Sequence, residues 1–340
     1  MLALLAGVAA LSGSSGTAVT WQRRIAVANA AGPTGLAALR LLRDRRANDE
    51  SCATLEVCAI CRDDAEVQAC RQAVCGAVVR DGVVRDICDA SFPSLRTIDA
   101  LSLQHSQDDD SLLCDALRGY TTLLLCLDEI HPVLAPLPGA VGDSADELIA
   151  TMPFPWSSEM SRCEEQSLRL IDAAASVGVQ HVILHSALGA SDFAGAEAGT
   201  PTSLLQMARM GGEQHLSLRR RLEERVESYS RREHPTLPLM RHTILQAAPY
   251  ASAEQLADRR LRERSAALAS RGSDAENADD DDEAARRSSP WLDRSPPITT
   301  PESLAHAAVE AALYTRPNTL KRKVKRRVTC EGTPSWTPCS

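Results

Sequence analysis

The chain has 340 residues, 44% of them hydrophobic, which is enough for one large domain or two small ones. A net charge of −8 argues against non-specific binding of nucleic acid, and an aromatic content of 3% argues against base-stacking platforms, so no nucleic-acid partner is expected. The 11 cysteines follow no compact spacing pattern, and we interpret them mainly as small buried hydrophobic residues in a reducing compartment.

Residues 1–21 are predicted to form a leader or a disordered extension. Residues 1–12 are apolar, but they are too short to span a bilayer and lack the basic start of a secretory signal. Residues 1–43 contain no acidic residue and are rich in Ala, Ser and Thr, a composition that resembles an organelle transit peptide. A disordered extension explains it equally well. A plastid and the cytoplasm are both open as locations, and no integral membrane span is expected.

Residues 24–40 predict a strand, a tight turn and a helix. Residues 25–28 are a short apolar run typical of a buried strand, and Leu36, Leu39 and Leu42 follow at helical spacing. This order of elements brings nucleotide phosphates to a helix N-terminus, where the helix dipole and unpaired N–H groups attract an anion. The stretch is therefore a candidate phosphate site.

The turn resembles the fingerprint T-G-A-T-G-x-T-G of the NmrA-like, NAD(P)-binding group of atypical short-chain dehydrogenase/reductases. Residues 28–35 read A-N-A-A-G-P-T-G, so Gly32 and Gly35 match the second and third glycines, and Asn29 replaces the first. Asparagine tolerates a left-handed turn better than most residues, so the bend can be kept. The resemblance implies that the cofactor binds at Asn29, Gly32, Pro33, Thr34 and Gly35.

A second strand is predicted at residues 55–60, shortly before Arg62. The residue after this strand faces the adenosine ribose in dinucleotide folds, where a carboxylate favours NAD and an arginine can pair with the 2′-phosphate of NADP. The family has an arginine at the position of Arg62, which implies NADP. Asp63 and Asp64 keep NAD possible, and a solvated surface arginine is an equal alternative.

Residues 83–89 resemble the third strand of the family and its G-D-x-x-D segment. The resemblance implies that Asp86 and the backbone at Ile87 reach the adenine. Residues 121–127 are a continuous apolar run, as expected for a central parallel strand buried on both faces. Residues 128–156, with five prolines and no clear periodicity, predict a long loop at the rim where ligands bind, either a lid or an insertion without function.

Gly119 and Gly178 are predicted helix stops. The segment that follows Gly178 resembles the fifth strand of the family and its serine, which implies that Ser186 orients the substrate oxygen. The Tyr-x-x-x-Lys of the family, whose tyrosine is the general acid, would fall on His215 and Arg219. Histidine could donate a proton. We favour an exposed basic helix held by Glu–Arg pairs three or four residues apart.

The later segments resemble the family less closely. Residues 242–248 resemble the sixth strand, but Gln246-Ala247 replaces the Arg-Pro that shapes the substrate pocket. Residues 272–289 are charged and poor in apolar residues, and predict a disordered acidic insertion. The predicted organisation is a leader at 1–21, a dinucleotide-binding domain at 22–270, the acidic insertion at 271–290, the C-terminal part of the same domain at 291–330, and a tail at 331–340.

Strands that alternate with helices predict an α/β fold with a doubly wound parallel sheet, Rossmann-like in arrangement. The resemblance implies an NADPH-dependent reductase of a small carbonyl-type substrate, with NAD as a possible cofactor. The alternative is a non-catalytic dinucleotide-binding sensor or scaffold with a protein partner. The changes at Asn29, at His215 with Arg219, and at Gln246 favour this alternative, because general acid catalysis typically contributes ~10²–10⁴-fold. No metal site is expected.

Overall fold

The computed structural model describes residues 23–80, 83–87, 92–97, 107–136, 148–151, 158–188, 190, 213–231, 240–251, 261, 299–314 and 325–330. The predicted leader, acidic insertion and C-terminal tail lie outside these residues. In the part of the chain that is described, no helix is both long and apolar enough to cross a membrane.

A seven-stranded sheet forms the centre of the fold, in the order β11-β10-β9-β6-β1-β2-β5, and every neighbouring pair in it is parallel. The chain reverses its direction of sheet growth between β1 and β6, which is the switch point of a doubly wound sheet. The predicted fold class is thus confirmed. The strands are β1 (Arg24–Ala28), β2 (Glu56–Cys61), β5 (Ser94–Thr97), β6 (Thr122–Leu125), β9 (His181–Ala187), β10 (Arg241–Ala247) and β11 (Lys325–Cys330).

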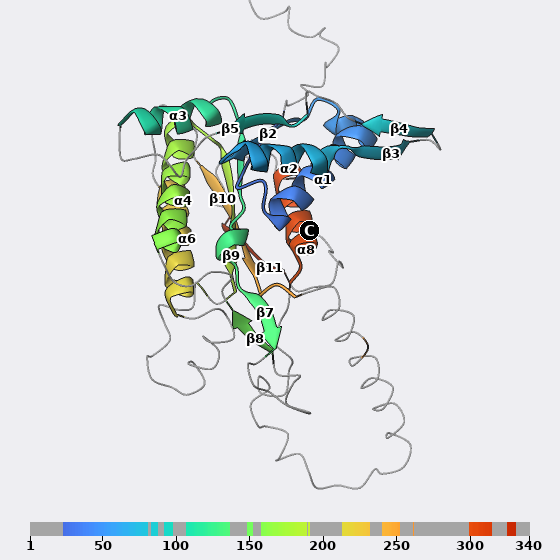
Figure 1. Ribbon diagram of the computed structural model, residues 1–340. Helices are drawn as coiled ribbons and strands as arrows, with labels where there is room; N and C mark the ends of the chain where they lie inside the picture. The colour runs from blue at the N-terminus through green and yellow to red at the C-terminus, as the bar shows by residue number, and fades with distance from the viewer. Residues whose placement is uncertain are drawn as a thin grey trace, which may run out of the picture.

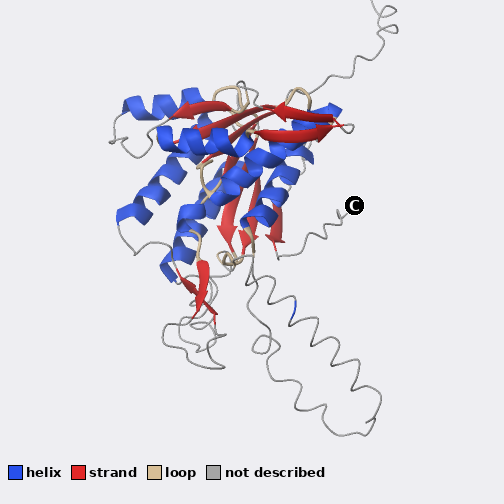
Figure 2. Cartoon of the chain, turned by 45° about the vertical axis from the view of Figure 1, so that its right-hand side comes forward, coloured by secondary structure: helices blue, strands red, loops and turns tan. Residues whose placement is uncertain are grey.

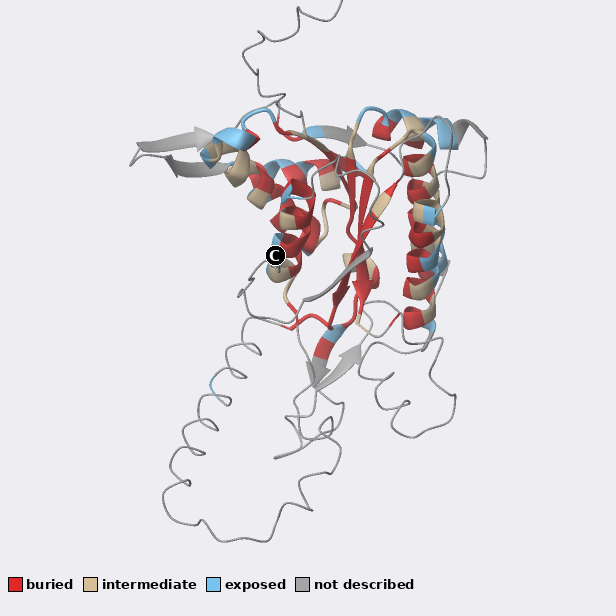
Figure 3. Cartoon of the chain, turned by 180° about the vertical axis from the view of Figure 1, so that it is seen from behind, coloured by how far each residue is buried: buried red, intermediate tan, exposed pale blue. Residues whose placement is uncertain are grey.

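Helices cover both faces of the sheet (Figure 1; Figure 2). One apolar core contains residues of α1, α2 and α8, and a second core contains residues of α3, α4 and α6. Figure 3 shows the buried residues along the strands and on the helix faces turned toward them. The helices are α1 (Pro33–Asn48), α2 (Asp64–Val74), α3 (Gln107–Leu117), α4 (Ser158–Ser176), α6 (Glu213–Arg231) and α8 (Pro301–Tyr314), with a short 3-10 helix η1 (Glu50–Cys52) after α1.

The sequence explains where several of these elements lie. The central strands β6 and β9 are buried at every position, because helices cover both sheet faces, and the leucine run of β6 suits such a position. Pro33 opens α1, where its missing N–H is not needed. The predicted helix stops Gly119 and Gly178 have φ angles of 84° and 81°, a left-handed conformation that glycine adopts without strain.

The predicted third strand was wrong. Residues 83–87 form β4 (Val83–Ile87), which pairs antiparallel with β3 (Gly76–Arg80) in a separate two-stranded sheet, while β5 takes the place beside β2. The reason is turn chemistry: Asp81-Gly82 stands between two runs rich in valine, and Asp-Gly between such runs is a strong signal for a two-residue hairpin.

The segment after β6, predicted as a long loop, contains regular structure at its start and end. A 3-10 helix, η2 (Asp128–Ile130), leads into β7 (Val133–Pro136), which pairs antiparallel with β8 (Leu148–Thr151). This hairpin projects beyond the carboxyl ends of the central strands (Figure 1). Because η2 directly follows β6, it lies at the switch point beside the β1–α1 turn.

Candidate functional site

The β1–α1 turn has the tight backbone that phosphate-binding turns use. Asn29 has a φ angle of 53°, so the asparagine keeps the left-handed bend, and its Nδ2 donates to the backbone oxygen of Cys126 at 2.9 Å. At Gly35 an added Cβ would lie 2.5 Å from the backbone oxygen of Ala30, so only glycine fits there without movement. The predicted turn residues therefore come together at the N-terminus of α1.

A carboxylate of the chain itself already binds that N-terminus. The backbone N–H of Thr34 donates to Asp128 Oδ2 at 2.9 Å, and the Thr34 hydroxyl donates to Asp128 Oδ1 at 2.6 Å. A Cβ at Gly32 would collide with Asp128 Oδ2, so the carboxylate lies against bare backbone. Asp128 therefore stands where the helix dipole and free N–H groups would attract a phosphate.

Tyr250 completes the contacts of this carboxylate. Its hydroxyl donates to Asp128 Oδ1 at 2.6 Å, and its oxygen lies 2.6 Å from the Thr34 hydroxyl oxygen. Burial, together with the Asp128 charge, raises the pKa of Tyr250 well above its usual value. The phenol therefore stays protonated at neutral pH and remains a donor to Asp128.

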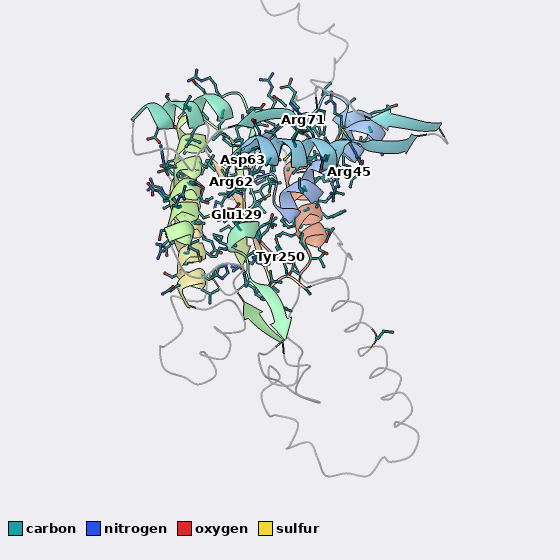
Figure 4. The ribbon with its side chains drawn as sticks, viewed as in Figure 1. Arg45, Arg62, Asp63, Arg71, Glu129 and Tyr250 are labelled. Atoms are coloured by element: carbon teal, nitrogen blue, oxygen red, sulfur yellow. The ribbon has the colours of Figure 1, made fainter. Side chains whose placement is uncertain are left out.

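Arg62, the predicted partner of a 2′-phosphate, is partly buried and pairs with two carboxylates. It forms ion pairs with Glu66 on α2 and with Glu129 on η2, and its backbone N–H donates to Glu66 Oε2 at 2.7 Å. Burial acts to lower the pKa of Arg62, but its hydrogen bond to Glu66 and the charges of Glu129 and Glu66 raise it above the ordinary value. Figure 4 shows Arg62 and Glu129 together, with Asp63 nearby. Asp63 caps α2, because its Oδ1 accepts from the backbone N–H of Glu66 at 2.9 Å.

Asp86 and Ile87 do not lie on the third parallel strand, where the resemblance had placed them. Both belong to β4, in the β3–β4 hairpin outside the parallel sheet. The chain that follows β5, the true third strand, continues through residues 98–106, which lie outside the described part. The adenine end of the predicted site is thus not defined.

Ser186, His215 and Arg219 come together in the interior, and the predicted exposure of the last two was wrong, because all three have an exposed fraction of 0%. Arg219 Nε donates to His215 Nε2 at 3.0 Å, and the Ser186 hydroxyl donates to Glu223 Oε1 at 2.7 Å. The predicted Glu–Arg pairs exist on the outer face of α6, for example between Arg220 and Glu224.

Arg219 uses its remaining N–H groups on backbone carbonyls. Nη1 donates to the oxygen of His185 at 2.8 Å, and Nη2 donates to the oxygens of Leu127 and Ile130 at 3.0 and 3.1 Å. Burial lowers its pKa to about 10, so the guanidinium stays charged at neutral pH. Because Leu127 and Ile130 flank Asp128 and Glu129, Arg219 fixes the turn that carries both carboxylates.

Two further histidines, His131 and His185, are buried beside Arg219. Burial, and then the Arg219 charge, lower the pKa of His131 to about 3. Burial, and then the proximity of His131 and Arg219, lower the pKa of His185 well below its usual value. His131 Nε2 donates to the oxygen of Ala248 at 2.8 Å, and its ring lies 4.1 Å from the ring of Tyr250, centroid to centroid. Both imidazoles are therefore neutral.

The sequence analysis missed several residues of this region. The i, i+4 spacing of His215, Arg219 and Glu223 beside the buried stripe Leu218, Leu222 and Val226 could have placed them inward. Nothing in the aperiodic segment after β6 marks which of its residues turn inward. The residues missed are Asp128, Glu129, His131, His185, Glu223 and Tyr250.

The described site does not fit a dinucleotide in this state. The Asp128 carboxylate occupies the anion position at α1, and Glu66 and Glu129 neutralise Arg62. A pyrophosphate or 2′-phosphate would meet negative charge at both places. Among the described residues, no group of three or more His, Cys, Asp or Glu side chains could hold a metal ion.

No protein-family model matches the chain, and no curated protein does. The fold is similar to solved structures at low identity. One is an NADPH-dependent quinone oxidoreductase from Escherichia coli, with 16% identity and a TM-score of 0.39; the alignment covers 86% of this chain and 64% of that protein, so the chain spans less than two thirds of its length. Another is a putative NAD-dependent epimerase/dehydratase from Bacillus halodurans, with 11% identity, coverage of 91% and 94%, and a TM-score of 0.46.

A third similar structure is the triphenylmethane reductase of Citrobacter sp. complexed with NADP(H), with 13% identity, coverage of 92% of this chain and 71% of that chain, and a TM-score of 0.45. An oxidoreductase of the short-chain dehydrogenase/reductase family from Burkholderia thailandensis is also similar, at 13% identity with a TM-score of 0.42. At such identities the similarity concerns the fold alone.

Proposed function

We propose that the protein binds a nicotinamide dinucleotide at the β1–α1 turn, NADP in preference to NAD, and acts without catalysis as a sensor or a scaffold for a protein partner. The switch point between β1 and β6, the left-handed Asn29 and the glycine-only position Gly35 support the dinucleotide part. Gly32, Pro33 and Thr34 would then face the pyrophosphate. Arg62 would pair with the 2′-phosphate once Glu129 leaves it.

The bonding of Arg219 carries the non-catalytic part of the proposal. Arginine Nε always bears a hydrogen, so His215 Nε2 accepts from it and has no proton to give at that atom. The hydrogen of Ser186 is directed to Glu223 rather than outward. These atoms of both predicted catalytic residues are therefore engaged within the fold, and a reductase here would lack the tyrosine–lysine pair through which general acid catalysis typically contributes ~10²–10⁴-fold.

A reductase of a small carbonyl-type substrate is the competing function, favoured by one observation. Ser186 and His215 are buried near the same end of β9, with Arg219 joining His215 to the backbone at His185. This is the grouping that an active site on this sheet would need, although its residue types differ from Tyr and Lys.

Calorimetric titration of the full chain with NADP⁺, NADPH, NAD⁺ and NADH tests the binding, and NADPH oxidation with a panel of aldehydes, ketones and quinones tests the chemistry. We expect binding of at least the NADP pair and no turnover. Turnover that disappears in His215→Ala or Ser186→Ala would establish the reductase instead. Failure to bind any of the four cofactors, both in the wild type and in a variant that lacks the Asp128 carboxylate at this turn, would refute the dinucleotide function.

A further inference from the structure

Two neighbouring carboxylates occupy the two positions where the pyrophosphate and the 2′-phosphate of NADP would bind. Asp128 accepts from the backbone N–H and the hydroxyl of Thr34 at the N-terminus of α1. Glu129, the next residue, pairs with the guanidinium of Arg62 at the end of β2. We propose that Asp128 and Glu129 act as internal substitutes for the pyrophosphate and the 2′-phosphate, and that the cofactor binds only when η2 releases them.

The geometry at α1 makes the competition direct. The Asp128 carboxylate lies so close to Gly32 that a Cβ there would collide with it. A phosphate would have to approach the backbone through the same space, because a glycine has no side chain to block the anion. A phosphate and the carboxylate have the same sign of charge and use the same donors, so they exclude each other.

The geometry at Arg62 distinguishes NADP from NAD. Glu129 engages the arginine that would recognise the 2′-phosphate, a group that NADP has and NAD lacks. Releasing Asp128 therefore helps both cofactors, whereas releasing Glu129 helps NADP alone. Glu66 remains on Arg62 in either case and holds the side chain in position.

Hydrogen bonds from α6 and from the chain after β10 fix the turn η2, which carries both carboxylates. Arg219 Nη2 donates to the oxygens of Leu127 and Ile130, on either side of the pair, and Tyr250 donates to Asp128. Release of η2 by the cofactor would thus disturb α6 and the chain after β10. This inference rests on the proposed dinucleotide function. It explains how cofactor binding at α1 would change the structure at α6 and after β10.

The test compares the full-length protein with Asp128→Asn, Glu129→Gln and a control, Glu56→Gln, by calorimetric titration with NADP⁺ and NAD⁺. Each variant removes one negative charge and keeps the shape of the side chain. Glu56 pairs with Arg24 at the beginning of β2, whereas Arg62 follows its end. Circular dichroism of each variant verifies that it is folded.

We expect Asp128→Asn to raise the affinity for NADP⁺ and NAD⁺ by about tenfold or more, Glu129→Gln to raise that for NADP⁺ alone, and Glu56→Gln to change neither. If Asp128→Asn binds a cofactor and the wild type binds none, the result also supports the inference that Asp128 blocks the site. Equal affinities in the wild type and both site variants would overturn the inference and leave the dinucleotide function standing. Absence of binding in the wild type and in every variant would refute both.

Discussion

The buried histidines should make the protein sensitive to mild acid, and His131 allows this to be tested. Burial lowers the pKa of His131 to about 3 and that of His181, helped by the Arg241 charge, to about 4, and it keeps His185 neutral as well. In the unfolded chain these rings have a pKa of about 6.5. Between these pKa values the unfolded state binds more protons than the folded state, so stability falls as the pH falls.

The magnitude follows from the linkage relation. A ring that is neutral when folded and has an unfolded pKa of about 6.5 contributes about 2 kcal/mol less stability at about pH 5 than at about pH 7.5. The three rings together lose about 6 kcal/mol, which is of the order of the whole stability of a typical domain. The stability is fully present above the unfolded pKa and is lost below it.

Urea unfolding at these two pH values, followed by circular dichroism, measures the loss. The substitution His131→Gln keeps a donor for the Ala248 oxygen but cannot titrate, so its loss between the two pH values should be smaller by about 2 kcal/mol than that of the wild type. The control is His306→Gln, because His306 is exposed on α8 and its ring is in water in both states. An unchanged pH dependence in His131→Gln would refute the reasoning.

Three further substitutions test the site. Gly35→Ala would place a Cβ 2.5 Å from the Ala30 oxygen and should destabilise the fold by about 1–3 kcal/mol in urea unfolding. Asn29→Ala should cost about 1–2 kcal/mol, because it forces alanine into a left-handed conformation and removes the donor to Cys126, whereas Asn29→Gly should cost less. Arg219→Gln should cost about 3 kcal/mol in thermal or urea unfolding, because it leaves buried carbonyl oxygens without donors. Arg118→Gln, at a side chain that is 73% exposed, should stay within about 0.5 kcal/mol, and equal losses in the two variants would contradict the buried role of Arg219.

The parallel sheet could be predicted because its signals are local. Apolar runs such as the one before Cys126 read as strands buried on both faces, and Gly119 and Gly178 mark helix ends through their backbone freedom. The third strand was missed because the valine-rich run after Asp81-Gly82 looks like a sheet strand, while the Asp-Gly pair specifies a hairpin. The competing turn signal was present in the sequence and was given too little weight.

The candidate site was predictable only in part. The turn at Asn29 lies at the N-terminus of α1 as predicted, because the chain order of a βαβ unit fixes it, whereas His215 and Arg219 were expected on an exposed helix face and are buried. The role of Asp128 depends on a contact with Thr34 across 94 positions of the chain, and no periodic pattern marks it. Long-range contacts of this kind are set by tertiary packing, so the sequence alone could not reveal that the anion position is taken.

The turn η2 touches both of the otherwise separate apolar layers. Asp128 and Glu129 reach α1 and Arg62 on one side, while the carbonyls of Leu127 and Ile130 receive Arg219 from α6 on the other. The first turn of α1 and the middle of α6 therefore belong to one cooperative unit, even though the sheet lies between them. Their backbone amides should lose protection from hydrogen exchange together, at a shared opening free energy, when η2 detaches.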